Sequence, residues 1–338
     1  MWQSRGRFWR DCGNRTGAAI LWRFHPGPTE VVVNLDLTPF SNRLRKNHRH
    51  WGKWARRREI SCYRIYDRDI PEFPLVIDWY EGRVHAQTFV RDEQEIAEED
   101  IAPVLCEVLE IPRQNLAFKS RQQQKGSTQY ERLRKYRKPF VVHEADLAFE
   151  VELHSYLDTG LFLDHRNTRA MVRDMSQQKR ILNLFAYTSS FSVYAAAGGA
   201  DGSVSVDLSN SYQEWSQRNF ELNKMDLKKH LLVREDVFKY LYLAQKNKER
   251  FDLIILDPPS FSNSKKMRDT LDVQRDHPKL LEGCVQLLNP GGKIIFSNNR
   301  RKFKIDPIIG EHGEEITHKT IPEDFKRHTA HRCWLFQA

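Results

Sequence analysis

Short apolar runs alternate with amphipathic stretches through the second half of the chain. From about Val141 onward this alternation predicts strands joined by crossover helices, and therefore a parallel sheet. The predicted strands are Arg180–Phe185, Gly202–Asp207, His230–Arg234, Phe251–Leu256, Lys293–Ser297, Glu315–Lys319 and Arg332–Phe336. The predicted helices are Asp164–Met175, Phe191–Ala197, Ser211–Asn223, Asp236–Gln245 and Asp272–Leu288. Five helix-linked strands followed by a hairpin-like pair indicate a doubly wound α/β fold.

The pattern is different in the first half of the chain. Apolar residues recur at helical spacing over Ser41–Arg58, with Ser41 as the predicted N-cap. Alternating runs then predict a small α+β domain, with a helix at Glu93–Leu109 and strands at Ser61–Tyr66, Leu75–Tyr80, Arg83–Phe89 and Leu116–Ser120. Upstream, short strands at Ile20–Phe24 and Glu30–Leu35 flank a Pro-Gly turn. We therefore divide the chain into a linker or remnant of an upstream segment, a small α+β domain and an α/β domain, at residues 1–39, 40–140 and 141–338.

Positive charge is clustered in and around the small domain. Lys and Arg number 54 against 45 Asp and Glu, which gives a net charge of +9. The predicted helix at 41–58 contains no acid, and the segment 119–138 contains only Glu131. Such runs cannot neutralise themselves, so we interpret both as RNA contacts, with a solvated helix face as the alternative. The candidate RNA-binding residues are Arg43, Arg45, Lys46, Lys53, Arg56, Arg57, Arg58, Arg121 and Lys125.

Several classes of protein are disfavoured by the composition. No apolar run approaches the roughly 20 residues that a membrane-spanning helix needs, and the N-terminus lacks the apolar core of a secretory signal. We therefore expect a cytoplasmic protein without membrane association. The cysteines are odd in number, scattered and never in a Cys-x-x-Cys pair, which argues against a disulfide framework and against a metal site: Cys12, Cys62, Cys106, Cys284 and Cys333.

Ligands of doubly wound sheets bind at the carboxyl ends of the strands, so the strand ends are the candidate site. The first strand ends in Asn183-Leu-Phe185-Ala-Tyr187-Thr188-Ser-Ser, a turn of mostly small residues before a helix. Such a turn lets a ligand approach backbone amides. It lacks the Gly-x-Gly-x-x-Gly pattern that binds a pyrophosphate, which disfavours a nicotinamide cofactor.

Acidic residues follow the next two strands. Asp207 ends the second strand, 24 residues after Asn183, where a carboxylate can accept hydrogen bonds from both ribose hydroxyls of a nucleoside cofactor. Asp236 follows the third strand, where it can meet an adenine amino group. Helix capping is the alternative explanation for each of them.

The fourth strand ends in the most specific pattern of the chain, Asp257-Pro258-Pro259-Ser-Phe261. Consecutive prolines remove two backbone donors and stiffen the strand exit, which can hold Asp257 and Phe261 in fixed positions. An aromatic side chain in this place can stack on a base that has left its helix. The alternative is a rigid turn followed by a core phenylalanine.

Several long motifs in a fixed order make the chain similar to a known family. They are residues 156–166 (YLDTGLFLDHR), the turn 183–190, Val-Asp-Leu-Ser before Tyr212, the segment 257–265 (DPPSFSNSK), residues 272–277 (DVQRDH) and residues 296–300 (FSNNR). From about Phe40 to the C-terminus the chain resembles the RlmK/RlmI-like ribosomal RNA methyltransferases, most closely the RlmK half of the bifunctional large-subunit enzymes. This resemblance implies a class I methyltransferase domain with a Rossmann-like doubly wound sheet, and a smaller N-terminal α+β module.

The resemblance also implies an activity and a set of site residues. The cofactor would be S-adenosylmethionine (SAM), and the reaction N7 methylation of a guanine in 23S ribosomal RNA, which makes that RNA the expected partner. The partner methyltransferase half of the bifunctional enzymes is absent, so covalent or non-covalent association with a second such domain is a further expectation. Asp257, Pro258, Pro259 and Phe261 would hold the base, and the cofactor would be bound by Asp164, Arg166, Asn183, Phe185, Tyr187, Thr188, Asp207 and Asp236.

One position departs from the family pattern, which has glycine after the Tyr-Thr pair where this chain has Ser189. If the backbone there needs a positive φ, serine costs about 1–2 kcal/mol. An RNA-binding protein with an inactive methyltransferase domain is therefore a second hypothesis. Methylation of guanine N2 and of cytosine C5 are alternative reactions. The cytosine reaction needs a cysteine nucleophile, and no cysteine follows Pro259.

Overall fold

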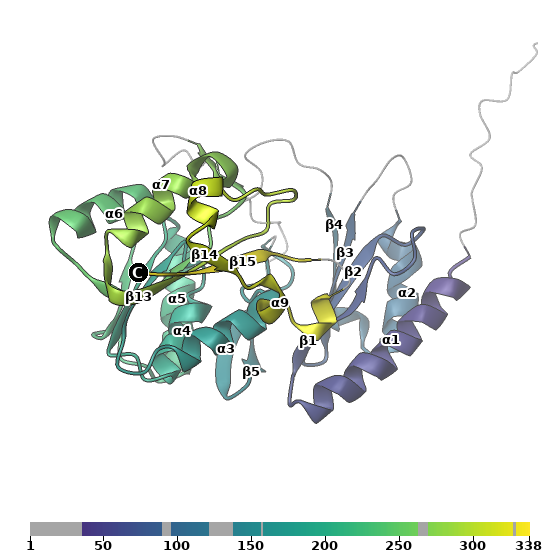
Figure 1. Ribbon diagram of the computed structural model, residues 1–338. Coiled ribbons are helices and arrows are strands. Elements are labelled where there is room, and N and C mark those ends of the chain that lie inside the picture. Colours follow the sequence, from purple (N-terminus) through teal and green to yellow (C-terminus); the bar gives the residue numbers. More distant parts are fainter. Residues whose placement is uncertain (1–35, 90–95, 122–137, 157, 263–269, 327–328) are drawn as a thin grey trace, which may run out of the picture. The chain divides into compact units, whose positions relative to one another are not determined.

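The computed structural model describes residues 36–89, 96–121, 138–156, 158–262, 270–326 and 329–338 (Figure 1). Within it, Leu37–Ala338 make up one compact unit with two main sheets. Most of the predicted linker or remnant, with its strands at Ile20–Phe24 and Glu30–Leu35, lies outside the described residues.

The N-terminal sheet has four strands in the order β1-β2-β3-β4. The first three are antiparallel, and β4 pairs parallel with β3. One face of this sheet packs against the helices α1 and α2, through a core that includes Phe40, Leu44, Ile77 and Leu105. The elements are α1 (Thr38–Arg57), β1 (Cys62–Asp67), β2 (Leu75–Tyr80), β3 (Arg83–Phe89), α2 (Glu98–Leu109) and β4 (Leu116–Arg121).

Helix α1 begins three residues before the predicted cap. The backbone N–H of Ser41 donates to the carbonyl of Leu37 at 2.9 Å, so Ser41 lies inside the first turn and not at the cap. Pro39 occupies the first turn, where its fixed φ suits the helix and its missing N–H is not needed. The prediction of Ser41 as the N-cap is therefore wrong.

A hairpin of β5 (Phe140–Glu144) and β6 (Leu147–Val151) follows, which the sequence pattern did not predict. Its apolar residues share a buried cluster with residues of the N-terminal sheet, among them Cys62, Tyr80 and Ala117. The same cluster contains Val193 and Phe220 of the helices that follow. The hairpin thus packs between the two main sheets.

The second sheet has seven strands in the order β14-β15-β13-β10-β7-β8-β9. The five strands from β13 to β9 are parallel, whereas β15 is antiparallel to β13 and β14 is antiparallel to β15. The strands are β7 (Arg180–Leu184), β8 (Gly202–Val206), β9 (His230–Val233), β10 (Phe251–Leu256), β13 (Leu288–Asn298), β14 (Gly313–Glu315) and β15 (Arg332–Gln337). The predicted α/β doubly wound sheet with a smaller α+β part is confirmed.

Helices connect these strands, as predicted from the alternating pattern. They are α3 (Arg166–Asp174, preceded by the 3-10 turn η3, Leu163–His165), α4 (Ser190–Ala197), α5 (Asn210–Leu222), α6 (Val237–Lys246) and α7 (Val273–Val285). The short helices α8 (Pro307–Gly310) and α9 (Thr317–Thr320) and the turn η4 (Glu323–Phe325) complete the C-terminal region. No helix in the described ranges combines the length and the apolar character needed to cross a bilayer.

The predicted strand at Glu315–Lys319 is wrong over most of its length. Strand β14 covers only Gly313–Glu315, and the next residues form α9. The hydroxyl of Thr317 donates to the Glu315 carboxylate at 2.8 Å and accepts the backbone N–H of Cys333 at 3.0 Å. These side-chain bonds satisfy the chain where it leaves the sheet edge, so the ladder ends early.

Two buried arginines on α3 tie the unit together. The Arg169 guanidinium makes a bidentate pair with Glu144 of β5, at 2.6 and 2.7 Å, and both side chains are almost fully buried. Arg166 pairs with Asp324 of η4 at 3.0 Å and donates to the carbonyl of Cys62 in β1 at 2.6 Å. Because unpaired buried charges are costly, each pair fixes the position of the elements it joins.

Candidate active site

The order of the parallel strands reverses between β7 and β10, so the carboxyl ends of β7, β8, β10 and β13 surround the switch point of the sheet. The sequence-predicted residues Phe185, Asp207 and Asp257 each follow one of these strands directly, and Tyr187 lies three residues after the end of β7. The fold therefore gathers them at one edge of the sheet.

The turn after β7 has an unusual backbone. Phe185, Tyr187 and Ser189 have φ angles of 56°, 51° and 59°, in the left-handed region that non-glycine residues seldom occupy. Strained backbone of this kind clusters at functional sites, where the surrounding structure holds it in place. Ser189 thus has the positive φ for which the related family uses glycine, and its hydroxyl donates to that of Ser216 at 2.8 Å.

Asp207 joins the turn after β7 to the end of β8. Its carboxylate accepts the backbone N–H of Tyr187 and that of Ser209, each at 2.9 Å. Burial raises the pKa of Asp207 to about 6, although both hydrogen bonds act in the opposite direction. Each carboxylate oxygen keeps a second lone pair, so Asp207 can still accept hydrogen bonds from a ligand.

Two of the predicted cofactor residues, Asn183 and Thr188, are buried and bonded within the protein. The Asn183 amide donates to the hydroxyl of Ser192 at 2.9 Å, and the Thr188 hydroxyl donates to the carbonyl of Gly160 at 2.6 Å. Gly160 has φ 100°, and a Cβ there would lie 2.3 Å from the ring of Trp215. The side chains of Asn183 and Thr188 therefore support the turn from behind.

Asp257 is held from two sides at the end of β10. The hydroxyl of Ser297, in β13, donates to one carboxylate oxygen at 2.6 Å, and Nε2 of His165 lies 3.6 Å from the other. The neighbouring Asn298 is buried, and its Nδ2 has no hydrogen-bond partner among the described residues. A buried donor without a partner is uncommon, and at the end of β13 it is available to a ligand.

Phe261 follows the two prolines and is 49% exposed, so it is not a core residue. It lies in β11 (Phe261–Ser262), which pairs antiparallel with β12 (Leu271–Asp272). Asp272 caps α7 and accepts a hydrogen bond from Arg300. Ser260 donates to Asn299 at 2.7 Å. Three motifs distant in the sequence, at 257–261, 272–277 and 296–300, therefore meet at the exit of β10.

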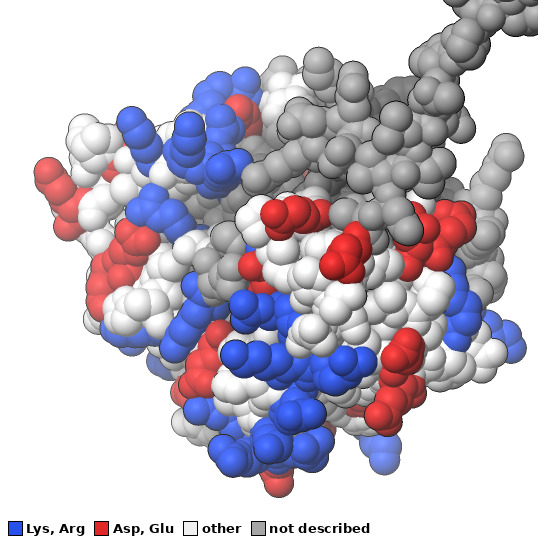
Figure 2. Space-filling model, turned by 90° about the vertical axis from the view of Figure 1, so that its right-hand side faces the viewer, with Lys and Arg blue, Asp and Glu red and all other residues white. Residues whose placement is uncertain are grey.

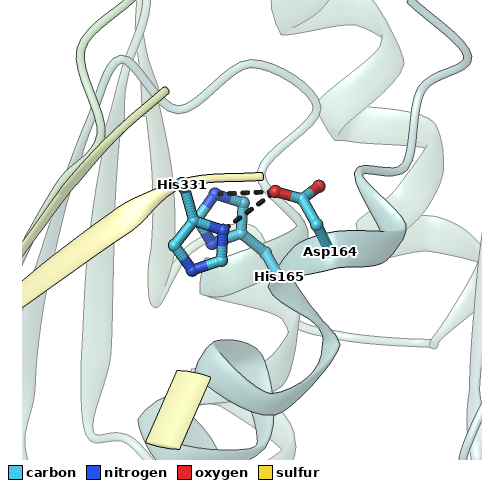
Figure 3. A group of neighbouring side chains, drawn as sticks. All are labelled: Asp164, His165 and His331. Atoms are coloured by element: carbon cyan, nitrogen blue, oxygen red, sulfur yellow. Dashed lines mark hydrogen bonds and ion pairs between the residues drawn. The ribbon is translucent and has the colours of Figure 1, made fainter. Parts of the chain in front are cut away.

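His165, which lies 3.6 Å from Asp257, belongs to a group of three titratable side chains. The group consists of Asp164, His165 and His331 (Figure 3). The two imidazole rings stack at a centroid distance of 4.0 Å, and Nδ1 of His331 is 2.9 Å from the Asp164 carboxylate. Their potential ligand atoms lie within 4.8 Å of one another. The other nitrogen of His331 is bonded to Thr320 at 3.1 Å, so hydrogen bonds within the protein account for this group without a metal.

Neighbouring groups shift the pKa values of His165 and Asp164. Burial and the adjacent His331 lower the pKa of His165 to about 4, although Asp257 and Asp164 oppose this shift. Burial alone would raise the pKa of Asp164, but His165 and His331 outweigh it and lower that pKa well below its ordinary range. His165 is therefore neutral near pH 7 and presents Nε2 toward Asp257 without adding a charge.

Two other predicted cofactor residues are explained by contacts of their own. Asp236 caps α6, because its side chain accepts the backbone N–H of Lys239 at 3.1 Å. Arg166 as a residue is 8% exposed. Its guanidinium donates hydrogen bonds to the Asp324 carboxylate and to the Cys62 carbonyl. The cofactor roles of Asp236 and Arg166 stay predictions, and for Arg166 this geometry favours a structural role.

The candidate RNA-binding residues of α1 are all exposed, and Figure 2 looks onto the side on which this helix lies, with Lys and Arg gathered beside some Asp and Glu. The helix has no acid of its own, but three of its arginines have acidic neighbours from elsewhere. Arg43 lies 4.0 Å from Asp69, Arg45 lies 3.8 Å from Glu107 and Arg58 lies 2.9 Å from Glu323. The expectation that this charge is uncompensated therefore holds only for part of the helix.

The second basic segment is largely outside the described residues, and Lys125 with it. Arg121 ends β4, opposite Phe89. Lys119 is buried, and its ammonium group donates to the carbonyl of Tyr156. Burial lowers the pKa of Lys119 to about 8. Lys119 therefore faces the protein and not a solvent-exposed RNA surface, which corrects the prediction for the start of this segment.

Sequence reasoning missed several residues of the site. Ser297 and His165 flank Asp257, His331 stacks on His165, and Asn298 ends β13, yet the sequence pattern predicts none of them as a site residue. Ser297 and Asn298 belong to the motif at 296–300, so the motif itself was the available signal. His331 immediately precedes β15, near the C-terminus, and no pattern in the sequence predicts it as a site residue.

The chemistry of these groups fits SAM. Asp207 offers acceptors suited to ribose hydroxyls. The turn at 185–189, with its left-handed residues, lies between β7 and α4, where backbone groups that no strand or helix uses can bind a ligand. The free Nδ2 of Asn298 adds a donor at the end of β13. A nucleoside with a charged tail needs acceptors and donors of this kind at the strand ends.

Comparison with known proteins agrees with this arrangement. A family model described as S-adenosylmethionine-dependent methyltransferase matches residues 118–326. The chain is 49% identical over 307 residues to ribosomal RNA large subunit methyltransferase K of Neisseria meningitidis, covering 88% of this chain and 87% of that protein. It is 48% identical over 304 residues to ribosomal RNA large subunit methyltransferase K/L of Hahella chejuensis, of which it spans 42%.

Solved structures show the same likeness at lower identity. A candidate methyltransferase crystallised with SAH has a TM-score of 0.73 and 25% identity, over 90% of this chain and 83% of that one. A structure from Streptococcus mutans, described as a candidate SAM-dependent methyltransferase, matches equally well over 82% of its chain. Together with the strand-end geometry, these relatives show that the chain is a SAM-dependent methyltransferase and that it belongs to the ribosomal RNA large subunit methyltransferase K family.

Proposed function

We propose that this chain transfers the methyl group of SAM to N7 of a guanine in 23S ribosomal RNA, as a cytoplasmic enzyme. The observation that carries the proposal is the pairing of Asp257 with an exposed Phe261 on a rigid Pro-Pro exit at the switch point of the sheet. The name of the relative from Neisseria meningitidis supports large-subunit ribosomal RNA as the substrate.

The residues around Asp257 suit guanine. The N1–H and N2 amino group of guanine are donors on its Watson–Crick edge, which a carboxylate accepts, whereas N7 is an acceptor on the Hoogsteen edge. A base held by Asp257 along its donor edge keeps N7 free, and Phe261 offers an exposed ring for stacking. The unpaired Nδ2 of Asn298 is a donor available to an acceptor atom of the base or of the cofactor.

SAM supplies an electrophilic methyl group when it is bound. The guanine N7 lone pair is available in the neutral base, so the chain needs no strong general base. The work of the chain is positioning, which the Pro258-Pro259 exit and the hydrogen bond from Ser297 to Asp257 provide. His165 is neutral near pH 7, so it adds no positive charge beside Asp257, and the proposed reaction does not need it to accept a proton.

Methylation of cytosine C5 is disfavoured by the described cysteines. That reaction needs a thiolate beside the base. Cys284 is buried in α7 and Cys333 is buried in β15, and burial raises the pKa of both thiols far above the ordinary value. Methylation of guanine N2 remains the second candidate reaction, because the same carboxylate can accept a hydrogen bond from the N2 amino group.

The test is to incubate the chain with labelled SAM and unmodified 23S ribosomal RNA, and to digest the product to nucleosides. We expect label in 7-methylguanosine. Label in N2-methylguanosine or 5-methylcytidine would replace the proposed atom. If SAM binds but no nucleoside is labelled on free RNA or on ribosomal particles, the chain is an RNA-binding protein with an inactive methyltransferase domain.

The base-holding role of Phe261 has its own test. Phe261→Ala should remove about 1–3 kcal/mol of stacking energy and so lower the rate of methyl transfer. SAM affinity should stay nearly unchanged. Tyr242, which is 65% exposed in the middle of α6, serves as the matched control, because Tyr242→Ala removes an exposed aromatic ring that does not follow a strand. A loss of SAM binding in Phe261→Ala would contradict the role in base stacking.

A second methyltransferase domain as a partner is also proposed. The chain spans 42% of K/L relatives from several organisms, and the rest of those proteins has no counterpart in the matched region. Size-exclusion chromatography of this chain, mixed with a separately produced second domain, would show co-elution if the two associate non-covalently.

A further inference from the structure

A large cavity lies away from the strand ends, in the N-terminal part of the unit. It has a volume of about 820 Å³. Helix α1 forms one wall, the start of β1 and the turn between β2 and β3 form another, and the last turn of α2 forms the third. This volume lies within the range of small-molecule pockets and is ample for a single nucleotide.

Aromatic rings form the inner wall of the cavity. The centroid of the His48 ring lies 5.6 Å from that of Trp79, and the centroid of the Tyr63 ring lies 6.5 Å from that of Trp79. Nδ1 of His48 is buried and has no hydrogen-bond partner in the described part of the chain. Burial lowers the pKa of His48, so the ring is neutral near pH 7 and presents a polar atom together with an aromatic face.

A glycine in the C-terminal half of α1 keeps the cavity open. Glycine is a poor residue for a helix interior, yet Gly52 lies inside this 20-residue helix, about one and a half turns before its end at Arg57. The backbone does not require it, because a Cβ there would meet the Tyr63 hydroxyl at 3.6 Å and an Arg56 nitrogen at 3.8 Å, which are ordinary contacts. A longer side chain at this position would extend into the cavity.

The rim carries charges of both signs. Arg45, Arg49 and Arg56 line it from α1, and Glu107 and Glu110 line it from α2. Glu81, in the turn between β2 and β3, also lines the cavity and accepts the backbone N–H of His143. Arg45 is close to Glu107, but Arg49 and Arg56 have no ion pair among the described residues. A bare polyanion would meet the three glutamates as well as the arginines. The arginines can bind an anionic group of a ligand, and the glutamates can accept hydrogen bonds from a neutral ring, so a ligand with both features fits this rim.

We propose that this cavity binds one unpaired nucleotide of the RNA substrate, with the base against Trp79 and His48 and the phosphate on Arg49 and Arg56. Aromatic faces stack on unpaired bases, and the glutamates are acceptors for base amino groups. The inference rests on the proposed RNA substrate. It adds a second point of contact, distinct from the base pocket at Asp257, that holds a neighbouring single-stranded nucleotide.

The test uses the full chain and a fluorescent single-stranded RNA of mixed sequence, about 12 nucleotides long, a length typical of such sites. Gly52→Leu fills the cavity without changing a charge. We expect it to weaken RNA binding about tenfold, with the slope of log affinity against log salt unchanged. Gly52→Ala is the matched control and should bind within about twofold of the parent, since its Cβ makes only ordinary contacts.

A second variant addresses the phosphate. Changing Arg49 and Arg56 together to Gln should weaken RNA binding and lower the salt slope by about 0.7 for each lost contact. Ultraviolet cross-linking of the parent should place RNA on a peptide that contains Trp79 or His48. Thermal melting of every variant, together with SAM affinity, shows that the strand-end site is intact.

The outcomes separate this inference from the proposed function. Equal RNA binding by Gly52→Leu and the parent overturns the pocket, whatever the methyl-transfer assay shows. Competition by inorganic phosphate alone, or by an acidic peptide as strongly as by RNA, also overturns it, because the ligand is then not a nucleotide. If Gly52→Leu weakens RNA binding while the parent methylates no RNA, the pocket stands and the proposed reaction fails.

Discussion

The strand-end site and the exposed face of α1 are built on opposite physical principles. At the strand ends, polar groups are buried, the backbone is strained, and Asp207 and Asp257 are each held by hydrogen bonds at 2.6–2.9 Å. On α1 the arginines and lysines are exposed, and several lack an ion pair within the described residues. The first arrangement fixes atoms in place, whereas the second attracts charge over a distance.

This difference determines what a substitution does in each region. At the strand ends, the loss of one side chain leaves a buried partner unsatisfied, so the effect is large and specific. On α1, the loss of one exposed charge lowers affinity by a small amount that depends on salt. The contacts of η4 connect the two regions, because Glu323 bonds to Trp54 and Arg58 of α1 while Asp324 holds Arg166 of α3.

The largest effect is expected at this connection. Asp324→Ala leaves the buried Arg166 guanidinium without its partner and should lower the free energy of unfolding by about 3–5 kcal/mol. Chemical denaturation measures it. Glu323→Gln is the control one residue away, because its partner Arg58 is 53% exposed, and that change should cost less than about 1 kcal/mol. Equal losses in the two variants would show that burial does not separate these pairs.

The next effect concerns cofactor binding at the strand ends. Asp207→Ala removes a buried carboxylate that is placed to accept ribose hydroxyls, and it should weaken SAM binding by about 1.5–3 kcal/mol. Calorimetry gives the affinity directly. Asp236→Ala should mainly remove the cap of α6 and cost about 1 kcal/mol of stability. If Asp207→Ala binds SAM as tightly as the parent, Asp207 supports the fold and not the cofactor.

The strand ends were predictable because each carries a chemical pattern that local sequence preserves. The bounds of β2, β3 and β10 agree with the prediction at both ends, since their apolar runs are bounded by turns. The exposure of Phe261 agrees with a ligand-facing ring and not with a core phenylalanine. The residues at these positions follow a strand directly, so finding the strand also finds the side chain.

What the sequence could not predict depends on contacts between distant segments. Arg166 lies two residues after Asp164 in a family motif, yet its guanidinium pairs with Asp324, 158 residues away in the sequence. His331 reaches Asp164 across a similar distance. The acidic neighbours of α1 come from three other elements, so a helix that contains no acid still has partly compensated charge. Local patterns contain no information about such partners.

On α1 the expected effect is smaller and depends on salt. Neutralising Lys53, Arg56 and Arg57 together should weaken binding of matched and mismatched RNA about equally, because phosphate contacts give affinity without base choice. The slope of log affinity against log salt should fall by about 0.7 for each lost contact on single strands. Arg58 is left unchanged, because losing its ion pair with Glu323 could also change the stability of the fold. An unchanged slope would mean that this face is only solvated.

The pH dependence of SAM binding follows from Asp207. Its pKa of about 6 in the folded chain lies above the ordinary 3.8, so the free protein takes up a proton here as the pH falls through 6. A protonated Asp207 is a poorer acceptor, and SAM affinity should fall by up to about tenfold per pH unit below 6. By the same linkage, this group makes the free fold less stable as the pH rises from 3.8 to 6. Asp207→Asn should show a weak affinity that is flat over this range.

The smallest effect is expected at Ser189, and it tests the hypothesis of an inactive methyltransferase domain. The residue has φ 59°, and replacing its Cβ with hydrogen should relieve about 1–2 kcal/mol of backbone strain. Ser189→Gly also removes the hydrogen bond to Ser216, which contributes about 0.5–1.5 kcal/mol. The two terms nearly cancel, so the free energy of unfolding should change by less than about 1 kcal/mol. Ser216 keeps its bond to the Tyr187 carbonyl, so the turn should hold its shape and SAM affinity should stay within about threefold. A gain in SAM affinity of tenfold or more would show that serine at this position impairs the site, and would favour the inactive domain.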